Sequence, residues 1–301
     1  MIIGHKRQKE FLNKALKHDR LAHAYIFSGP SHIGKKALAL EFAQTVLCSQ
    51  RNNVGACGQC PSCKMFKKAV HPDFLLIRPE ESETQIHISK IEELIRFLSI
   101  SRSFSEYKIV IIDHAHSLGK RAQNCLLKTL EEPRGNAILI LVTEHPDILF
   151  PTICSRTQEI KFSTVPLKTI ITFLEQQDVS TEEKKHLLRF NAGKPGRIIN
   201  FLEMSGDMDV EKKQFKKLEK VLCSDLEIRF NYAKTLSTMP IKENLEIWLN
   251  YFRVKLLEKL DKGEETENIQ RNLSLLMRVN FLIATTNVNR KLLLENLMLA
   301  I

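Results

Sequence analysis

A glycine-rich loop between an apolar strand and a helix is the feature that most constrains the fold of this chain. Residues 29–36 read GPSHIGKK, which follows the phosphate-loop pattern G-x-x-x-x-G-K. The apolar run 24–29 leads into the loop, and a helical pattern at 35–48 follows it. A strand, such a loop and a helix in this order open a β-α-β unit, whose strands are parallel. The loop therefore predicts an α/β fold around a mainly parallel sheet.

Four further apolar runs have the length and composition of buried strands. Apolar residues dominate all of them except the last, which has three polar residues, and they alternate with helical patterns, as the strands of a parallel sheet do. They cover residues 73–79, 108–113, 137–144 and 158–162. Together with the first run they place the sheet in the first half of the chain.

Two residues that a hydrolytic site needs are replaced. A phosphate loop ends in a Ser or Thr whose hydroxyl ligates Mg²⁺, and this chain has Lys36 at that position. The strand run 108–113 ends in Asp113, and His114 stands where many ATPases carry a glutamate. We expect Lys36 to repel Mg²⁺ and His114 to replace poorly a carboxylate that orients water. The chain is built like an ATPase without the groups for efficient hydrolysis.

The loop nevertheless keeps residues suited to a phosphate. Gly29 and Gly34 let backbone N–H groups face one, and the following helix N-terminus adds positive potential. Lys35 is the expected phosphate-binding lysine. Two alternatives stay open: the loop binds nucleotide, or it keeps its fold and has lost its ligand.

Four of the seven cysteines form the compact pattern C-x8-C-x2-C-x2-C at Cys48, Cys57, Cys60 and Cys63. Two overlapping C-x2-C steps place three thiolates around one ion, and Cys48 completes a tetrahedron. Structural zinc with no open coordination position is the prediction, and the alternatives are an iron–sulfur cluster, a redox dithiol or plain core cysteines. The zinc segment, about residues 48–70, lies as an insertion between a helix and the next strand.

Composition bounds the setting in which the chain works. Its 301 residues suffice for two or three domains, and the formal net charge of +10 fits nucleic acid or acidic partners, or else a solvated basic surface. No apolar run reaches about eighteen residues, so no membrane partner is expected. The N-terminal sequence lacks a secretory signal pattern, which predicts a cytoplasmic location and disfavours disulfides.

The strand signals stop near residue 165. Short helical patterns fill residues 165–207, and residues 208–301 read as helical throughout. The sequence predicts three domains: a nucleotide-binding-like core at 1–164, a small helical region at 165–207 and an all-helical domain at 208–301. The apolar terminal helix at 289–301 is either internal core, the default, or a subunit contact.

Besides the loop and the cysteines, the chain carries a dense and ordered set of short motifs. They are IIGH at Ile2, RLAHAYIFSGP at Arg20, HPDF at His71, YKIVIIDHAHSL at Tyr107, AQNCLLKTLEEP at Ala122, ILVTEHP at Ile140, PTICSRTQ at Pro151 and GKPGRI at Gly193. This set resembles the clamp-loader branch of the AAA+ ATPases, most closely the delta-prime class of bacterial DNA polymerase III subunits. The resemblance covers about residues 1–200 and implies an AAA+ core with a zinc insertion, a helical lid and a C-terminal collar.

The resemblance also implies roles for three residues. Arg156 in TICSRT matches the arginine that reaches a neighbouring subunit's γ-phosphate, although Thr157 stands where the family usually has cysteine. Thr143 falls at the first sensor position and Arg197 at the second. The alternatives are a surface salt bridge for Arg156, an ordinary strand end for Thr143 and a surface arginine for Arg197.

The function implied by the resemblance is that of a stator. Such a subunit assembles with delta and tau/gamma subunits, which use ATP and Mg²⁺ to open the beta sliding clamp and load it on primed DNA. Arg156 would serve a neighbouring tau/gamma ATP site, and zinc would be structural. Two alternatives stay open: an active tau/gamma-like ATPase and a zinc-dependent DNA-binding module.

Overall fold

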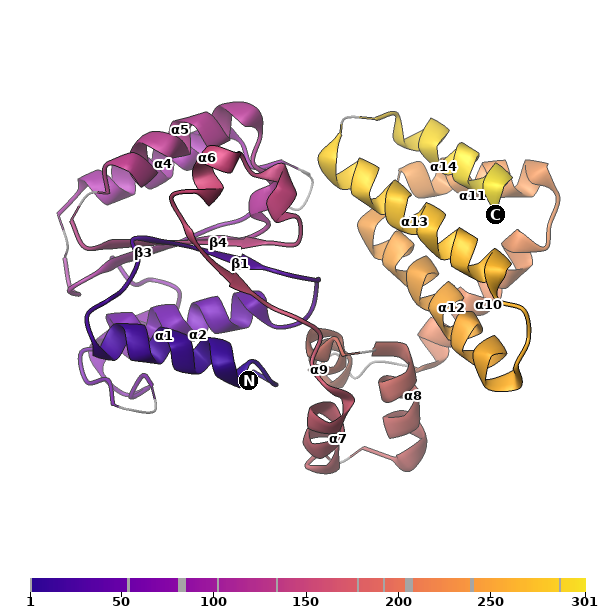
Figure 1. The fold of residues 1–301 in the computed structure, drawn as a ribbon, viewed down its shortest axis with the longest axis horizontal. Helices are drawn as coiled ribbons and strands as arrows, with labels where there is room; N and C mark the ends of the chain where they lie inside the picture. The colour runs from indigo at the N-terminus through magenta and orange to yellow at the C-terminus, as the bar shows by residue number, and fades with distance from the viewer. Residues whose placement is uncertain are drawn as a thin grey trace. The chain divides into compact units, whose positions relative to one another are not determined.

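The computed structural model divides the chain into two compact units. The N-terminal unit comprises Met1–Phe173 and Gly193–Gly196, and the C-terminal unit comprises Leu174–Ala192 and Arg197–Ile301. Figure 1 shows the path of the chain through both. The structure describes residues 2–52, 55–80, 85–101, 103–133, 135–177, 179–191, 193–203, 208–238, 241–286 and 288–301.

The N-terminal unit is built on a parallel sheet, as predicted. Within the described residues the sheet has five strands in the order β2-β3-β4-β1-β5, and every pairing is parallel. Each strand falls inside one of the five predicted runs. The strands are β1 (Ala24–Ser28), β2 (Phe74–Ile77), β3 (Lys108–Ile112), β4 (Ala137–Thr143) and β5 (Gln158–Lys161).

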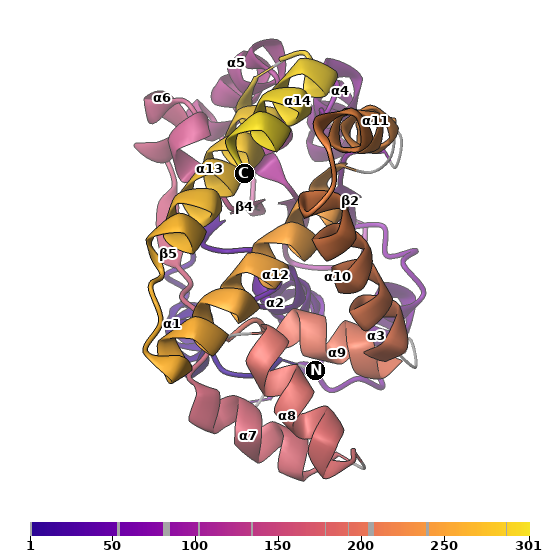
Figure 2. The same ribbon diagram turned by 90° about the vertical axis from the view of Figure 1, so that its right-hand side faces the viewer.

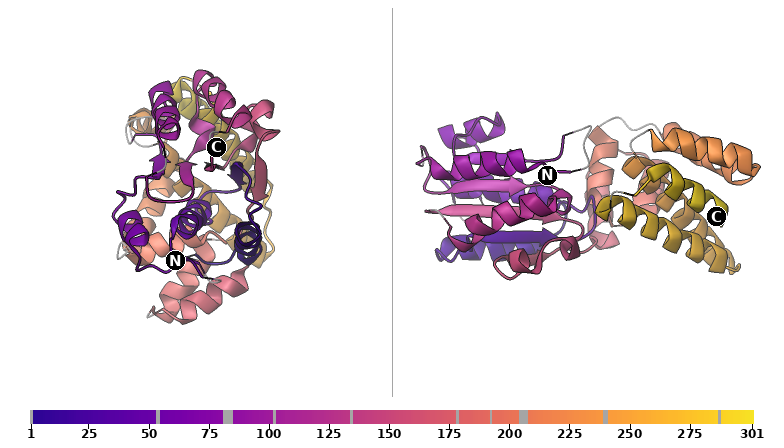
Figure 3. Two further views of the ribbon diagram at one scale, coloured as in Figure 1. Left: turned by 90° about the vertical axis from the view of Figure 1, so that its left-hand side faces the viewer. Right: turned by 90° about the horizontal axis from the view of Figure 1, so that it is seen from above.

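Helices cover both faces of this sheet (Figures 1 and 3). Tyr25 and Phe27 belong to the core shared with α1 and α2, and Ile26 belongs to the core shared with α4 and α5. Alternate residues of one strand therefore serve opposite cores. Each fully buried side chain of this size contributes about 1.5–3 kcal/mol. The helical elements here are α1 (Lys6–Lys17), α2 (Lys35–Leu47), α3 (Pro61–Lys67), α4 (Ile88–Ser99), η1 (Ala115–Ser117), α5 (Lys120–Glu131), η2 (Pro146–Ile148), α6 (Pro151–Cys154) and α7 (Leu167–Glu175), which ends in the other unit.

The C-terminal unit is helical throughout its described part (Figure 2). Trp248 is buried at its centre and stacks on Tyr232, with ring centroids 6.0 Å apart. Leu294 and Met298 of the last helix are buried in the same core. This helix therefore contributes to the interior, which was the default prediction for it. The helices are α8 (Thr181–Asn191), α9 (Pro195–Glu203), α10 (Met208–Leu222), α11 (Leu226–Ser237), α12 (Ile241–Lys262), α13 (Glu267–Thr285) and α14 (Arg290–Ala300).

The predicted three-domain division is not decided by these two units and stays a prediction. Its first boundary, at 164, lies in the connection between β5 and α7. Its second boundary, at 207, lies outside the described residues. Among the described helices, none combines the length and the apolar surface that crossing a membrane requires.

Candidate functional site

The phosphate loop connects β1 to α2 at the carboxyl end of the sheet. Gly29 has a φ of 142°, and a Cβ there would lie 2.3 Å from the carbonyl oxygen of Phe162. Only glycine fits such a position. Gly34, with a φ of 101°, immediately precedes α2. The structure therefore brings Gly29, Gly34 and Lys35 together in the loop geometry that the sequence predicts.

Lys35 turns its ammonium group into the loop itself. Its Nζ donates a hydrogen bond to the carbonyl oxygen of Gly29 at 2.6 Å and another to that of Pro30. The residue is only 6% exposed, and this burial lowers the pKa of Lys35 to about 8, against the opposing effect of the Glu144 and Asp113 carboxylates. A phosphate would have to replace the two carbonyl partners.

Lys36 forms an ion pair with the acid that ends the third strand. Its Nζ lies 2.9 Å from Oδ2 of Asp113, whose side chain is 8% exposed. From the sequence, Lys36 is expected to repel Mg²⁺, and in the structure it also neutralises the carboxylate suited to hold the metal. His114 has a left-handed φ of 53°, and its backbone N–H donates to Oδ1 of the same aspartate at 3.1 Å. Both oxygens of Asp113 are therefore engaged by its own chain.

Thr143 ends β4 beside the phosphate loop. Its carbonyl oxygen accepts a hydrogen bond from Gly29 N–H at 3.2 Å. Its hydroxyl lies 3.3 Å from Nδ1 of His116 and accepts from the backbone N–H of His145 at 3.1 Å. The structure places this predicted sensor residue at the loop, but a sensing role stays a prediction. His116 and His145 could not be predicted from the sequence, because their proximity depends on β3 and β4 ending at one edge of the sheet.

The GKPG segment contacts the phosphate loop within the N-terminal unit. The backbone N–H of Gly196 donates to the carbonyl oxygen of His32 at 2.7 Å. The Nζ of Lys194 lies 3.3 Å from the hydroxyl oxygen of Ser31. These bonds brace the outer side of the loop.

Arg197, the predicted second sensor residue, has an acidic partner in its own unit. Its Nη2 lies 2.5 Å from Oε2 of Glu246 on α12, and both side chains are largely buried. The sequence-based alternative to a sensor was a surface arginine, and the burial does not agree with that alternative. Contact with a nucleotide stays a prediction.

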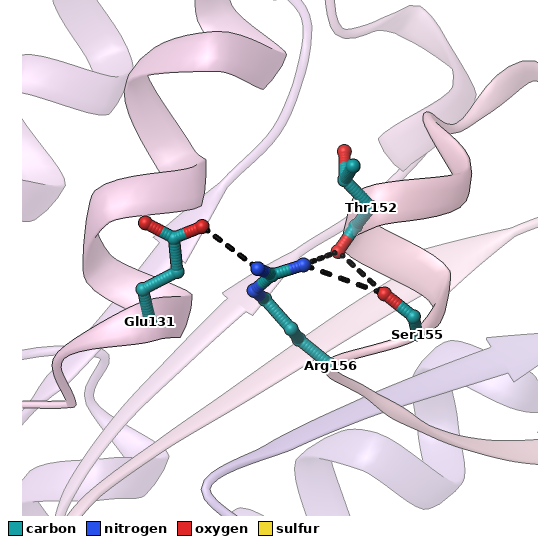
Figure 4. Close-up of polar contacts among 4 residues, drawn as sticks. All are labelled: Glu131, Thr152, Ser155 and Arg156. Atoms are coloured by element: carbon teal, nitrogen blue, oxygen red, sulfur yellow. Dashed lines mark hydrogen bonds and ion pairs between the residues drawn. The ribbon is translucent and has the colours of Figure 1, made fainter.

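Arg156 lies directly after α6, near the end of α5 (Figure 4). Its Nη2 lies 2.9 Å from Oε1 of Glu131, and its Nη1 donates to the carbonyl oxygen of Thr152 at 3.1 Å and to the hydroxyl of Ser155 at 3.4 Å. The side chain is 37% exposed. The surface salt bridge that the sequence left open is therefore present, on an arginine that remains accessible to solvent. The sequence predicted no role for Glu131, which lies within the motif AQNCLLKTLEEP.

Thr157, which departs from the family pattern, has a local structural role. Its hydroxyl donates to the carbonyl oxygens of Ile153 at 3.0 Å and Cys154 at 3.1 Å. These carbonyls lie at the C-terminal end of α6, where they also accept the backbone N–H groups of Arg156 and Thr157. Threonine thus stabilises the turn that carries Arg156.

The four predicted zinc ligands meet at one place. Their sulfur atoms all lie within 4.8 Å of one another. The Sγ of Cys48 lies 3.5 Å from that of Cys57 and 3.8 Å from that of Cys60. A tetrahedron with Zn–S bonds of about 2.3 Å has an S–S edge of about 3.8 Å. The geometry and the all-sulfur donor set therefore fit Zn²⁺, and the fourth member is Cys63.

Backbone groups around the cluster favour thiolates. The N–H of Cys57 points to Cys48 Sγ at 3.4 Å, that of Cys60 to Cys57 Sγ at 3.3 Å, and that of Cys63 to Cys60 Sγ at 3.4 Å. Hydrogen bonds donated to a charged sulfur stabilise it. Cys60 also caps α3, which begins with Pro61.

The HPDF motif ties the cysteine insertion to the sheet. His71 is buried, and its Nε2 lies 2.9 Å from the hydroxyl of Ser62, which donates to the carbonyl oxygen of Leu47 at 2.6 Å. Asp73 accepts hydrogen bonds from three successive backbone N–H groups of residues 103–105. The motif therefore has a structural explanation that requires no ligand.

Comparison with known proteins gives consistent results. A profile of the family described as DNA polymerase III, delta subunit, matches residues 4–166. The chain is 35% identical over 179 residues to DNA polymerase III subunit delta' of Pseudomonas aeruginosa, and that match covers 58% of this chain and 54% of the relative. It is 33% identical over 218 residues to the Bacillus subtilis protein of the same name, covering 72% and 64%. The chain thus spans between about half and two thirds of these relatives.

A solved structure agrees in fold. The gamma subunit-related protein of DNA polymerase III from Thermotoga maritima aligns over 97% of both chains, with a TM-score of 0.53 and 19% sequence identity. At this identity the likeness concerns the fold alone. It extends to the helical C-terminal part, where the sequence patterns were least specific.

Proposed function

The chain belongs to the DNA polymerase III delta-subunit family, and from that premise we propose that it is a delta-prime-like clamp-loader subunit that lends Arg156 to a neighbouring ATP site. The two curated relatives described above carry the delta-prime name. In this proposal the chain assembles with delta and tau/gamma subunits, and their ATP drives loading of the beta sliding clamp on primed DNA. The chain acts as a stator rather than as a motor.

The Lys36–Asp113 ion pair is the observation that carries this proposal. Phosphoryl transfer depends on Mg²⁺ to bridge phosphate oxygens and neutralise developing charge. Here the carboxylate suited to the metal lies 2.9 Å from an ammonium group of its own chain. A metal ion would have to displace that ammonium and then bind beside it. This arrangement favours a passive subunit over the active tau/gamma-like ATPase.

Arg156 has the properties that a residue acting in trans requires. Its guanidinium group carries a positive charge and a planar fork of donors that matches phosphate. It is also partly exposed at the end of α6. An arginine finger stabilises charge on the transferred phosphoryl group and contributes about 10³–10⁵ in rate. The tau/gamma site that we propose as its target would otherwise lack this charge.

Zinc would have a structural role in this subunit. The residues Cys48, Cys57, Cys60 and Cys63 would hold it, and a four-sulfur shell leaves no position for water or substrate. The metal would lock the insertion that follows α2. A DNA-binding role for this element is the competing hypothesis, and tight binding of DNA by the isolated chain that weakens steeply with salt would support it.

The decisive experiment reconstitutes the loader with Arg156→Ala. We expect DNA- and clamp-stimulated ATP turnover to fall by about 10³-fold at the site that receives the arginine. Arg7→Ala, which removes an exposed arginine on α1, is the matched control and should leave turnover unchanged. Size-exclusion chromatography establishes that both complexes assemble. Normal turnover in an intact Arg156→Ala complex would reject the role in trans.

A second measurement separates the stator from the active ATPase. We expect the purified chain to show no Mg²⁺-dependent ATP turnover above background. Steady turnover by the lone chain that Lys35→Ala abolishes would instead establish the motor alternative, because Lys35 is the lysine expected to contact phosphate.

A further inference from the structure

The guanidinium group of Arg156 is held from two sides. On one side Nη2 meets the carboxylate of Glu131 at 2.9 Å, and on the other Nη1 meets Thr152 and Ser155. Arginine has five N–H donors in a planar fork. These three contacts use three of them, which leaves two without a partner among the described residues. These contacts set the orientation of the guanidinium group (Figure 4). The two remaining N–H donors stay available to a ligand.

Glu131 is placed unusually for a helix residue. It is the last residue of α5, where the helix dipole disfavours a negative charge. Within the part of the chain that the structure describes, Arg156 is its one ion-pair partner. Its side chain is 49% exposed, and ion pairs at that exposure contribute little to stability. Fold stability is therefore a weak explanation for this pair.

We propose that Glu131 is a positioning residue for Arg156, which it holds in the conformation that meets the triphosphate of a neighbouring subunit. This inference rests on the proposed role of Arg156 in trans. In this proposal, the side-chain conformation of Arg156 is set by Glu131 on α5 as well as by the turn that follows α6. Glu131 does not touch the nucleotide in this proposal, and acts only through the guanidinium.

The physical basis is the cost of ordering a long side chain. A free arginine loses considerable rotamer freedom when it binds a phosphate, and prior fixation removes part of that cost. The carboxylate also repels phosphate, but solvent reaches both partners and screens this repulsion. Oε1 of Glu131 lies 2.9 Å from Nη2, a distance at which an oxygen can accept a hydrogen bond whether or not it carries charge. Glutamine at this position keeps an acceptor, whereas alanine removes it.

The test is a double-mutant cycle in the reconstituted loader. Glu131→Ala should lower kcat for stimulated ATP hydrolysis about tenfold and leave KM unchanged, since small misplacements of a catalytic group have effects of this order or larger. Glu131→Gln should recover at least about half of the lost rate, because it retains the acceptor. In the Arg156→Ala background, Glu131→Ala should have no further effect. Glu132→Ala, at the exposed neighbouring position, is the control.

The outcomes separate this inference from the proposed function. If Arg156→Ala lowers turnover and Glu131→Ala does not, the positioning role is wrong and the function in trans stands. An equal effect of Glu131→Ala with and without Arg156 also rejects positioning. Higher turnover in both Glu131 variants would mean that the carboxylate competes with phosphate, which contradicts the proposal. If Arg156→Ala itself has no effect, the proposed function fails and this inference fails with it.

Discussion

The phosphate loop and the Arg156 surface both present cations, but they use them in opposite ways. Lys35 and Lys36 direct their ammonium groups to acceptors of their own chain, two loop carbonyls and Asp113. Arg156 also has internal partners, but it is partly exposed and keeps two donors. The comparison shows that a phosphate-loop sequence does not by itself make a lysine available to a ligand. The lysine is available only if acceptors of its own chain do not already bind its ammonium group.

Lys35 and Arg156 also differ in the chemistry of their charged groups. Burial lowers the pKa of Lys35 to about 8, so its charge depends on conditions near neutrality. Arginine stays charged at any pH at which the protein is folded, and its planar fork can bind its own chain and a ligand at once. An exposed arginine is therefore better suited than a buried lysine to act on another subunit.

The largest effect beyond removal of the arginine is expected from Arg156→Lys. Lysine keeps the positive charge but loses the fork that reaches Glu131 and Thr152 together, so we expect stimulated ATP turnover to fall by about 10²-fold. The measurement is turnover by the reconstituted loader, with assembly checked as before. Near-normal rates in this variant would mean that charge alone suffices and that the contrast in geometry is irrelevant.

Opening the phosphate loop should produce the next largest effect. Replacing Lys36→Thr together with His114→Glu removes the internal ion pair and restores a hydroxyl and a carboxylate beside Asp113. We expect Mg²⁺-dependent nucleotide binding to tighten about tenfold, or about 1.4 kcal/mol. Isothermal titration with and without Mg²⁺ measures this change, and Lys128→Thr, at an exposed position on α5, is the control. Unchanged affinity would show that Lys36 is not what closes the pocket.

The nucleotide affinity of the Lys36→Thr, His114→Glu variant should also depend on pH. Lys35 has a pKa of about 8 in the free protein, and a bound phosphate raises the pKa of an adjacent ammonium. The two substitutions remove a positive charge and add a carboxylate, so the pKa of Lys35 lies higher in the variant than in the unaltered chain. We expect affinity to be constant up to at least about pH 8 and to fall above the pKa of Lys35 by up to about tenfold per pH unit, because binding there takes up a proton. Titrations of the Lys36→Thr, His114→Glu variant provide the data, and Lys35→Met in that background should abolish the dependence.

The smallest effect on stimulated ATP turnover is expected from loss of the metal site. Cys57→Ser should reduce the zinc content of the purified chain from about one per molecule to near zero. The cysteine cluster packs separately from the two cores of the sheet, so we expect stimulated turnover to change by less than about threefold. Metal analysis and turnover on one preparation test both statements. A loss as large as that of Arg156→Lys would mean that the insertion supports the finger directly.

Features that depend on local spacing could be predicted from the sequence. All five strand runs and the helix after the loop form as expected, because apolar period and glycine placement are properties of adjacent residues. The convergence of the four cysteines was also expected, since the short C-x2-C steps bring most of them together. The three-domain division is the part that stays undecided.

The partners of the site residues could not be predicted. Lys36 meets Asp113 only because α2 starts beside the end of β3, and Glu131 meets Arg156 only because α5 and α6 end near each other. Such pairs depend on how distant elements pack, and a single sequence carries no signal for them. The sequence therefore predicted repulsion between Lys36 and Mg²⁺, which stays a prediction, but not the ion pair between Lys36 and Asp113.

The close approach of Gly29 to the Phe162 carbonyl has a consequence for how such loops are recognised. Any side chain at this position would collide with the backbone that follows β5, so the fold demands glycine whether or not a nucleotide ever binds. The presence of this first glycine is therefore no evidence that the loop binds ATP, because chain packing alone requires it. In a protein of this architecture, the residue that follows the loop lysine tells more about ATP use.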